Sequence, residues 1–227
     1  MNGIPKNLKA LYYFSILFPG SIVLICWSIF YSLDHWNQKY LPTISVTVIP
    51  HPESLIFGVG MAIESIVLLV LLFIRNLVLK AHFRNIPVTW KIRLLHLFFL
   101  LSGASSIAGL AVLANVTLKD NFAMHNLAAS FFFFGSFIHH FITDSLFFAT
   151  GLHVKKISEY LTYAIIIFAF IYMMFLSRDN NTCKSIAAIL QYFACIFIFV
   201  KIILIYSDMP HHFLSSRSRN TNQGIYN

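Results

Sequence analysis

Residues 40–58 read YLPTISVTVIPHPESLIFG and lie between two long apolar runs. Three of the chain's seven prolines, Pro42, Pro50 and Pro52, fall in this segment. Proline cannot continue a helix, and it pushes the residue before it into extended geometry. The segment is therefore predicted to be a fixed, kinked connection between two helices, and the rest of the chain to be a bundle of helices joined to it.

The composition excludes an ordinary water-soluble globule. Of the 227 residues, 58% are hydrophobic and 11% are charged, and the mean hydropathy is +0.75. Soluble domains carry roughly 25% charged residues, so this chain has too little polar surface to cover a soluble core of its size. An integral membrane protein is the expected class.

Six apolar runs each approach the roughly 20 residues that a helix needs to cross hydrocarbon. Small residues cluster between positions 103 and 109, which predicts that the third helix packs closely against its neighbours. The predicted fold class is all-α: a polytopic membrane protein of six transmembrane helices with a proline-rich first lumenal loop. The predicted helices cover about residues 11–31, 54–74, 94–114, 122–149, 160–176 and 185–206.

The net charge of +8 is distributed unevenly over the predicted loops. Lysine and arginine concentrate on the cytoplasmic side of membrane proteins. With a cytoplasmic N-terminus that side collects most of them, including Arg75 just after the second helix. The other side collects only Lys39, Lys119, Arg178 and Lys184. Both termini are therefore predicted to be cytoplasmic, and because topology explains the positive charge, no nucleic-acid partner is expected.

The domain organisation is correspondingly simple. Residues 1–206 are predicted to form one transmembrane domain. Residues 207–227 are polar and rich in Ser and Asn, a composition that predicts a disordered cytoplasmic tail.

Ionisable residues inside a bilayer are costly and are therefore candidates for function. Glu64 lies near the middle of the second helix, where it is either protonated and hydrogen-bonded to a neighbour or lines a polar cavity for a lipid headgroup or an ion. Asp144 and Lys201 lie at similar depth in the fourth and sixth helices, so they can pair as a structural clamp; a snorkelling lysine is the other interpretation. His125 opens the fourth helix at the lumenal face, either as a pH-sensitive group or as an interfacial polar residue.

Other chemistry is not indicated by the residue pattern. The three cysteines lack the spacing of a metal site or of a disulfide framework, and no catalytic motif occurs. We expect no metal, no cofactor and no catalytic residues. Two glycosylation sequons begin at Asn115 and Asn180, on the predicted lumenal side, but both loops are so short that the acceptors lie against the bilayer.

The opening segment resembles the first lumenal loop of the Frag/DRAM/Sfk family of six-helix membrane proteins. In its damage-regulated autophagy modulator (DRAM) branch the loop reads P-x-I-S, a short spacer and then P-P-E-S-x-I-F-G, and here His51 replaces the first proline of the second part. Two acidic positions of the relatives look like Val46 and Gln191 in this chain. The matching residues are Pro42, Ile44, Ser45, Pro52, Glu53, Ser54, Phe57 and Gly58, followed later by Ala114, Asn115 and His125.

The resemblance implies three different roles. DRAM-type members are lysosomal or endomembrane proteins that promote autophagy, other members support lipid remodelling of GPI anchors in the Golgi, and plasma-membrane relatives affect phosphoinositide signalling and lipid asymmetry. The E-S-x-I-F-G form of the loop points to the DRAM branch.

We therefore expect a DRAM-like multi-pass regulator of autophagy or lysosomal function rather than an enzyme. The expected location is the lysosomal or another endomembrane, with the Golgi and the plasma membrane as alternatives. It would act through membrane lipids, with a membrane protein as a candidate partner, and a rigid lumenal cap would cover Glu64 and His125. The alternative is a GPI-anchor lipid-remodelling factor or a partner of a lipid-modifying membrane enzyme.

Overall fold

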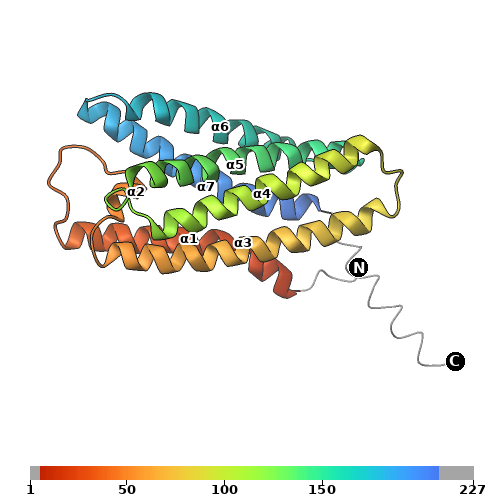
Figure 1. Ribbon diagram of the computed structural model, residues 1–227, viewed down its shortest axis with the longest axis horizontal. Helices are drawn as coiled ribbons and strands as arrows, with labels where there is room; N and C mark the ends of the chain where they lie inside the picture. Colours follow the sequence, from red (N-terminus) through yellow and green to blue (C-terminus); the bar gives the residue numbers. More distant parts are fainter. Residues whose placement is uncertain (1–5, 210–227) are drawn as a thin grey trace.

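The computed structural model describes residues 6–209, which form seven helices (Figure 1). Six of these helices are long and apolar enough to cross a membrane, and no strand occurs within the described range. The all-α, six-span fold predicted from the sequence is therefore confirmed. The helices are α1 (Lys6–Ser32), α2 (Ile44–Thr47), α3 (Glu53–Phe83), α4 (Trp90–Asn115), α5 (Phe122–Ala149), α6 (Lys156–Leu176) and α7 (Asn181–Asp208).

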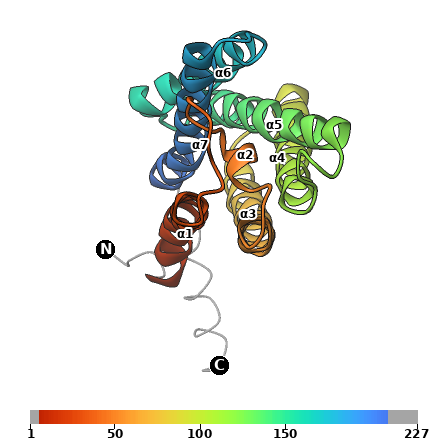
Figure 2. The same ribbon diagram turned by 90° about the vertical axis from the view of Figure 1, so that its left-hand side faces the viewer.

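The six long helices form a closed ring. Each contacts the next along the chain, from α1 and α3 through to α6 and α7, and α7 returns to α1. Figure 2 shows the bundle from one end, with the short α2 lying across the middle of that end. We call it the α2 end; it holds residues 33–52, 116–121 and 177–180. The opposite end, the terminal end, holds the start of α1, the end of α7 and residues 84–89 and 150–155.

Polar side chains define where three of the long helices begin. Thr89 accepts a hydrogen bond from the backbone N–H of Ile92, and Asn121 accepts one from that of Met124. Asn180 caps α7 in the same manner. Each cap satisfies a backbone donor that has no partner within the helix. These residues explain why α4, α5 and α7 start where they do.

The second membrane helix is longer than the sequence predicted. It was expected to end near residue 74, but α3 continues to Phe83. Arg75, assigned from the sequence to a cytoplasmic loop, is instead a buried residue of the helix. It donates hydrogen bonds to Tyr12 and His139. At the other end of the chain α7 continues through Asp208. The helix therefore includes the first residues of the predicted tail, and the rest of that tail, 210–227, lies outside the described residues.

Glycine sets the distance between α4 and its neighbours. A Cβ atom at Gly109 would lie 2.6 Å from the backbone nitrogen of Phe132 in α5, and one at Gly58 would lie 2.7 Å from the carbonyl oxygen of Ala114. No other residue fits such a separation without a shift of the backbone. The close packing predicted for this helix is therefore confirmed.

Candidate functional site

The proline-rich segment of the sequence closes the α2 end of the bundle. The backbone N–H of Ile44 donates to Gln191 Oε1 at 2.8 Å, and the Tyr192 hydroxyl donates to the carbonyl oxygen of Pro42 at 3.3 Å. Both partners lie on α7, more than a hundred residues further along the chain. We refer to residues 41–48 as the cap, because these bonds hold them across the end of the bundle.

His125 joins the cap to the other side of the ring. Its Nδ1 donates to the carbonyl oxygen of Val116 at 2.7 Å, since a carbonyl can only accept. In the neutral ring Nε2 then carries no proton, and it accepts the hydroxyl of Ser45 at 2.9 Å. The side chain of His125 is buried, and its functional role stays a prediction. It therefore connects α2 with α5 and with the connection that precedes α5.

Glu53, a residue of the loop motif, anchors the start of α3. Its carboxylate oxygen Oε1 lies 2.7 Å from Nδ1 of His35, and its backbone oxygen accepts the thiol of Cys26 at 3.6 Å. Glu53 is fully buried. His35 thus joins the connection between α1 and α2 to the start of α3. The sequence did not single out this residue.

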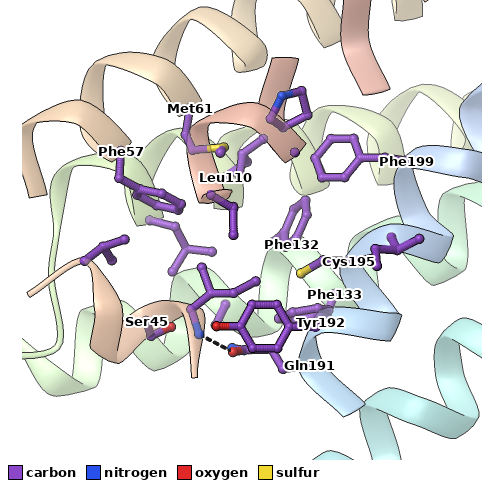
Figure 3. Close-up of a pocket in the computed structure, with 18 of the residues that line it drawn as sticks. Ser45, Phe57, Met61, Leu110, Phe132, Phe133, Gln191, Tyr192, Cys195 and Phe199 are labelled. Carbon is purple, nitrogen blue, oxygen red and sulfur yellow. Dashed lines mark hydrogen bonds between the residues drawn. The ribbon is translucent and has the colours of Figure 1, made fainter. Parts of the chain in front are cut away.

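A cavity of about 580 Å³ lies beneath the cap. Residues of α1, α2, α3, α4, α5 and α7 line it, so it occupies the middle of the ring at the α2 end. Figure 3 shows labelled side chains from four of the long helices around this space, with the bond from the cap to Gln191 at its edge. Large apolar side chains make up most of its wall, among them Phe57, Met61, Leu110, Phe132, Phe133 and Phe199.

The polar groups of this cavity gather at the cap. Ser45, His125, Gln191 and Tyr192 line its α2 end, and among its described lining residues none is Asp, Glu, Lys or Arg. Gln191 stands where an acidic residue is expected from the family resemblance. The cavity can therefore hold an apolar molecule whose hydroxyl or carbonyl group lies near the cap, and burying a charged group there would be costly.

The cavity opens sideways between two helices. Most of its lining residues are buried or half-buried, but Gly20, Leu24 and Ile196 are exposed on the outside of the bundle. All three lie on α1 or α7, and a Cβ atom at Gly20 would meet no atom within 4 Å. Since both helices cross the membrane, this opening faces hydrocarbon rather than water.

Glu64 does not line this cavity. Its side chain is fully buried, and neither carboxyl oxygen has a hydrogen-bond partner among residues 6–209. Met61, one turn before it, lines the cavity beneath the cap, as do His125 and Ser45. A functional role of Glu64 stays a prediction.

Asp144 and Lys201 meet in the terminal half of the bundle. Lys201 Nζ lies 2.7 Å from Asp144 Oδ2 and 2.8 Å from Oδ1, and it also donates to the backbone oxygen of Ser158 at 2.7 Å. The hydroxyl of Thr162 donates to Asp144 at 2.8 Å. The sequence left two interpretations open for Lys201, a clamp with Asp144 and a snorkelling side chain. The structure shows the clamp, because Lys201 is completely buried and does not snorkel.

Both predicted glycosylation acceptors lie at helix ends of the α2 end. Asn115 is the last residue of α4 and donates to the backbone oxygen of Ala111 at 2.8 Å. Asn180 is the capping residue of α7. Both side chains are exposed, and their modification stays a prediction.

The family described as the Frag1/DRAM/Sfk1/Cwh43P N-terminal domain matches residues 7–212. The chain belongs to this family. The match extends from the first turn of α1 through the whole of α7, so the six-span bundle and its capped cavity constitute the Frag1/DRAM/Sfk1/Cwh43P domain. No curated protein and no solved structure gives a significant match.

Family membership confirms the resemblance drawn from the loop motif, while the assignment to the DRAM branch stays a prediction. Sequence reasoning noted Gln191 only as a departure from the family pattern and did not single out Tyr192, although both anchor the cap. Two adjacent polar residues inside an otherwise apolar run were the available signal, because buried polar groups in membranes require partners.

Proposed function

We propose that this protein is a DRAM-like membrane regulator of autophagy or lysosomal function that binds a lipid in the cavity beneath its cap. The part of the proposal that concerns autophagy rests on the loop motif of residues 42–58. The part that concerns lipid rests on the cavity itself, which is the observation that carries the proposal.

The size and lining of the cavity favour an apolar ligand. Ligand sites in proteins commonly measure about 300–1,000 Å³, and the cavity of about 580 Å³ lies within this range. Burial of apolar surface contributes roughly 25 cal/mol per Å², so an acyl chain or a ring system gains free energy among Phe57, Leu110 and Phe132. The opening between α1 and α7 lets such a molecule enter from the hydrocarbon layer without passing through water.

The neutral polar groups of the cap orient the ligand. A hydroxyl or carbonyl group that reaches Ser45 or Gln191 can exchange hydrogen bonds with groups that now bond the cap to α5 and α7. Ligand binding and the position of the cap are thereby coupled, since both use the same atoms. A ligand that binds one position of the cap more tightly than another shifts the population of molecules toward that position. The lipid content of the membrane would thereby be converted into a signal at the α2 end.

The lipid proposal is tested by filling the cavity. Ala129 lines it and Ala123, in the first turn of the same helix, is exposed and does not. We expect Ala129→Phe to abolish labelling by a photoreactive fatty acid supplied in liposomes and to remove co-purified lipid detected by native mass spectrometry. Ala123→Phe should bind as the unaltered protein does. Equal labelling of the two variants would contradict binding at this site.

The cellular role is tested in cells that lack the protein. Autophagic flux should fall in these cells and return with the unaltered protein or with Ala123→Phe, but not with Ala129→Phe. The lipid composition of surface GPI-anchored proteins distinguishes the alternative role in anchor remodelling. A changed anchor with normal flux would replace the regulator proposal by the remodelling one.

A further inference from the structure

A second, much smaller cavity lies deeper in the bundle. It measures about 40 Å³ and is lined by residues of α3, α4, α5 and α7. In contrast to the wall beneath the cap, its lining includes a cation, Arg75, and two histidines, His139 and His140. Two serines, Ser106 and Ser136, complete its polar surface.

Arg75 is a buried cation whose hydrogen-bonding capacity is only partly used. Only 4% of the residue is exposed. Its Nε donates to the Tyr12 hydroxyl at 3.3 Å and Nη1 donates to His139 Nε2 at 3.5 Å, while Nη2 has no partner among the described residues. The guanidinium also lies over the Tyr12 ring, 5.5 Å from its centre. That ring attracts the positive charge but does not supply an acceptor for Nη2.

The histidines add donors rather than negative charge. His139 Nδ1 lies 3.0 Å from the carbonyl oxygen of Phe99, so this nitrogen carries the proton and Nε2 is free to accept from Arg75. Neither ring nitrogen of His140 has hydrogen-bond geometry to a described residue, although the ring faces the backbone of Ile198. The N–H of a neutral His140 therefore faces this backbone without a well-formed bond, and it is the second donor among the residues that line the cavity.

The serines do not compensate the charge of Arg75. Their hydroxyl oxygens lie 2.6 Å apart, and Ser106 also donates to the carbonyl oxygen of Phe132 at 3.3 Å. With Ser136 donating to Ser106, both protons are used within the protein. Neither hydroxyl carries a charge that could balance the guanidinium.

The carboxylate of Asp144 does not balance the charge of Arg75 either, because it is bound by other residues. No Asp or Glu is among the described residues that line the small cavity. Asp144, one turn after His140 on α5, accepts from Lys201 through both oxygens and from Thr162. Asp208, whose side chain is 2% exposed, lies 3.8 Å from Lys155, and among the described residues no carboxylate forms an ion pair with Arg75.

We propose that the small cavity is a binding site for a monatomic anion of the chloride class, held by Arg75 Nη2 and an N–H of His140. The volume selects the class of ligand. One water needs roughly 10–15 Å³ measured in this way, so about 40 Å³ accommodates one halide with little other solvent. A phospholipid headgroup would require the helices to separate.

Such an anion would join three helices of the ring. Arg75 belongs to α3 and His140 to α5, and Ile198 of α7 closes the cavity. The site lies about 12 Å along the helix axis from the last residue of α3, at 1.5 Å per residue, so an anion would enter from the terminal end. The bound charge would offset the cost of keeping an unpaired guanidinium away from water. This site is independent of the lipid proposal, because it shares only Phe132 with the larger cavity.

The test uses the full chain purified in detergent, with sodium chloride replaced by sodium gluconate at constant ionic strength. Gluconate is too large for the cavity. We expect the thermal unfolding midpoint to rise with chloride concentration and to saturate, with bromide acting in the same way. Equilibrium binding of radioactive chloride should show one site per chain, and crystals soaked in bromide should show an anomalous peak beside Arg75.

Variants separate this site from a general effect of salt. Arg75→Gln should lose the chloride dependence of the midpoint and weaken chloride binding about tenfold or more, as expected for a hydrogen bond to a charged group. Arg84→Gln, at an exposed arginine just beyond the same helix, should retain both. His140→Phe preserves the ring volume and removes the second donor, so it should weaken binding while the chain still folds.

Equal midpoints of the unaltered protein in chloride and in gluconate would overturn the proposal. So would an undiminished chloride response in Arg75→Gln, or water without any anomalous signal at the bromide-soaked cavity. If Arg75→Gln does not fold, the measurements on the unaltered protein and on His140→Phe still decide, because neither depends on that variant.

Discussion

The two halves of this bundle differ in the size of their cavities and in their polar contacts, although a buried carboxylate, Glu53, occurs at the α2 end as well. At the α2 end, neutral groups are bonded to the backbone of the cap, as in the pair of Ile44 and Gln191, and they surround a cavity of about 580 Å³. In the terminal half, charged groups are bonded to each other, as in the pair of Asp144 and Lys201, and the space left is about 40 Å³. The α2 end thus surrounds a large apolar cavity, and the terminal half surrounds a small one whose lining includes the cation Arg75.

The difference indicates where each half can change. Hydrogen bonds between neutral groups contribute roughly 0.5–1.5 kcal/mol each, so those of the cap can be exchanged for bonds to a ligand at small cost. Separating a buried ion pair costs several kcal/mol per ion. The cap is therefore the adjustable part of the molecule, and the clamp of Asp144 and Lys201 is the fixed part.

The largest expected effect comes from breaking the clamp. Lys201→Met leaves the Asp144 carboxylate buried without its cation, which should destabilise the protein by about 3–5 kcal/mol. Thermal unfolding in detergent measures this loss. The matched control is Lys184→Met, because the partner of Lys184, Asp179, is 97% exposed, and this change should leave the unfolding midpoint unaltered.

A double variant checks the cause of that loss. Asp144→Asn combined with Lys201→Met removes both charges and should recover most of the stability. If the double variant is as unstable as Lys201→Met, packing of the lysine stem rather than charge pairing holds this half together, and the contrast between the two halves fails.

A smaller effect is expected from the cap. Gln191→Leu leaves the backbone N–H of Ile44 without its acceptor, at a cost of about 1–3 kcal/mol. Hydrogen exchange measured by mass spectrometry should accelerate in residues 41–48 and stay unchanged in the terminal half. Gln38→Leu is the control, since Gln38 is exposed in the same connection. Acceleration throughout the bundle would mean that the cap and the clamp are not separate units.

The smallest effect concerns an exposed turn of the α2 end. The hydroxyl and the backbone N–H of Thr117 donate to Asp120 at 2.7 and 3.0 Å, and these bonds hold the pKa of the Asp120 carboxyl below its usual value of 3.8. A depressed pKa in the folded state gives stability that is present above pH 3.8 and is lost as the pH falls through the folded value. The turn should therefore be unchanged between pH 7 and pH 5.

Amide exchange at Thr117, corrected for the intrinsic dependence on pH, measures this behaviour. Protection should decrease only below pH 3.8 in the unaltered protein, and Asp120→Asn should remove that decrease. A loss of protection already at pH 5 would contradict control of the turn by Asp120.

Much of the fold was predictable because its signals are local. Six apolar runs of sufficient length gave the six spans, and the limits of α5 agree with the predicted 122–149. Small residues between 103 and 109 predicted the close approach of α4 and α5. The error at α3 has a physical reason: Arg75 suggested a loop because a charge is unfavourable in hydrocarbon, whereas its partners, Tyr12 and His139, lie on other helices.

The candidate site was less predictable than the fold. The loop motif marked the cap, and His125 was selected as polar, but nothing in the sequence connected Ser45 to His125 or Ile44 to Gln191. In a membrane the outward faces of helices are as apolar as the inward ones, so hydropathy does not reveal which side of α7 faces the cap. The cavity and its opening beside Gly20 consequently had no signal in the chain.

The sequence by itself determined the class of protein, the number of spans and the family, because each depends on composition or on residues close together in the chain. The tertiary structure decided what the polar residues do. Whether Lys201 snorkels or pairs, whether Arg75 is in a loop or in the interior, and which groups hold the cap all depend on how each helix is rotated about its axis. That rotation is fixed only when six helices pack together.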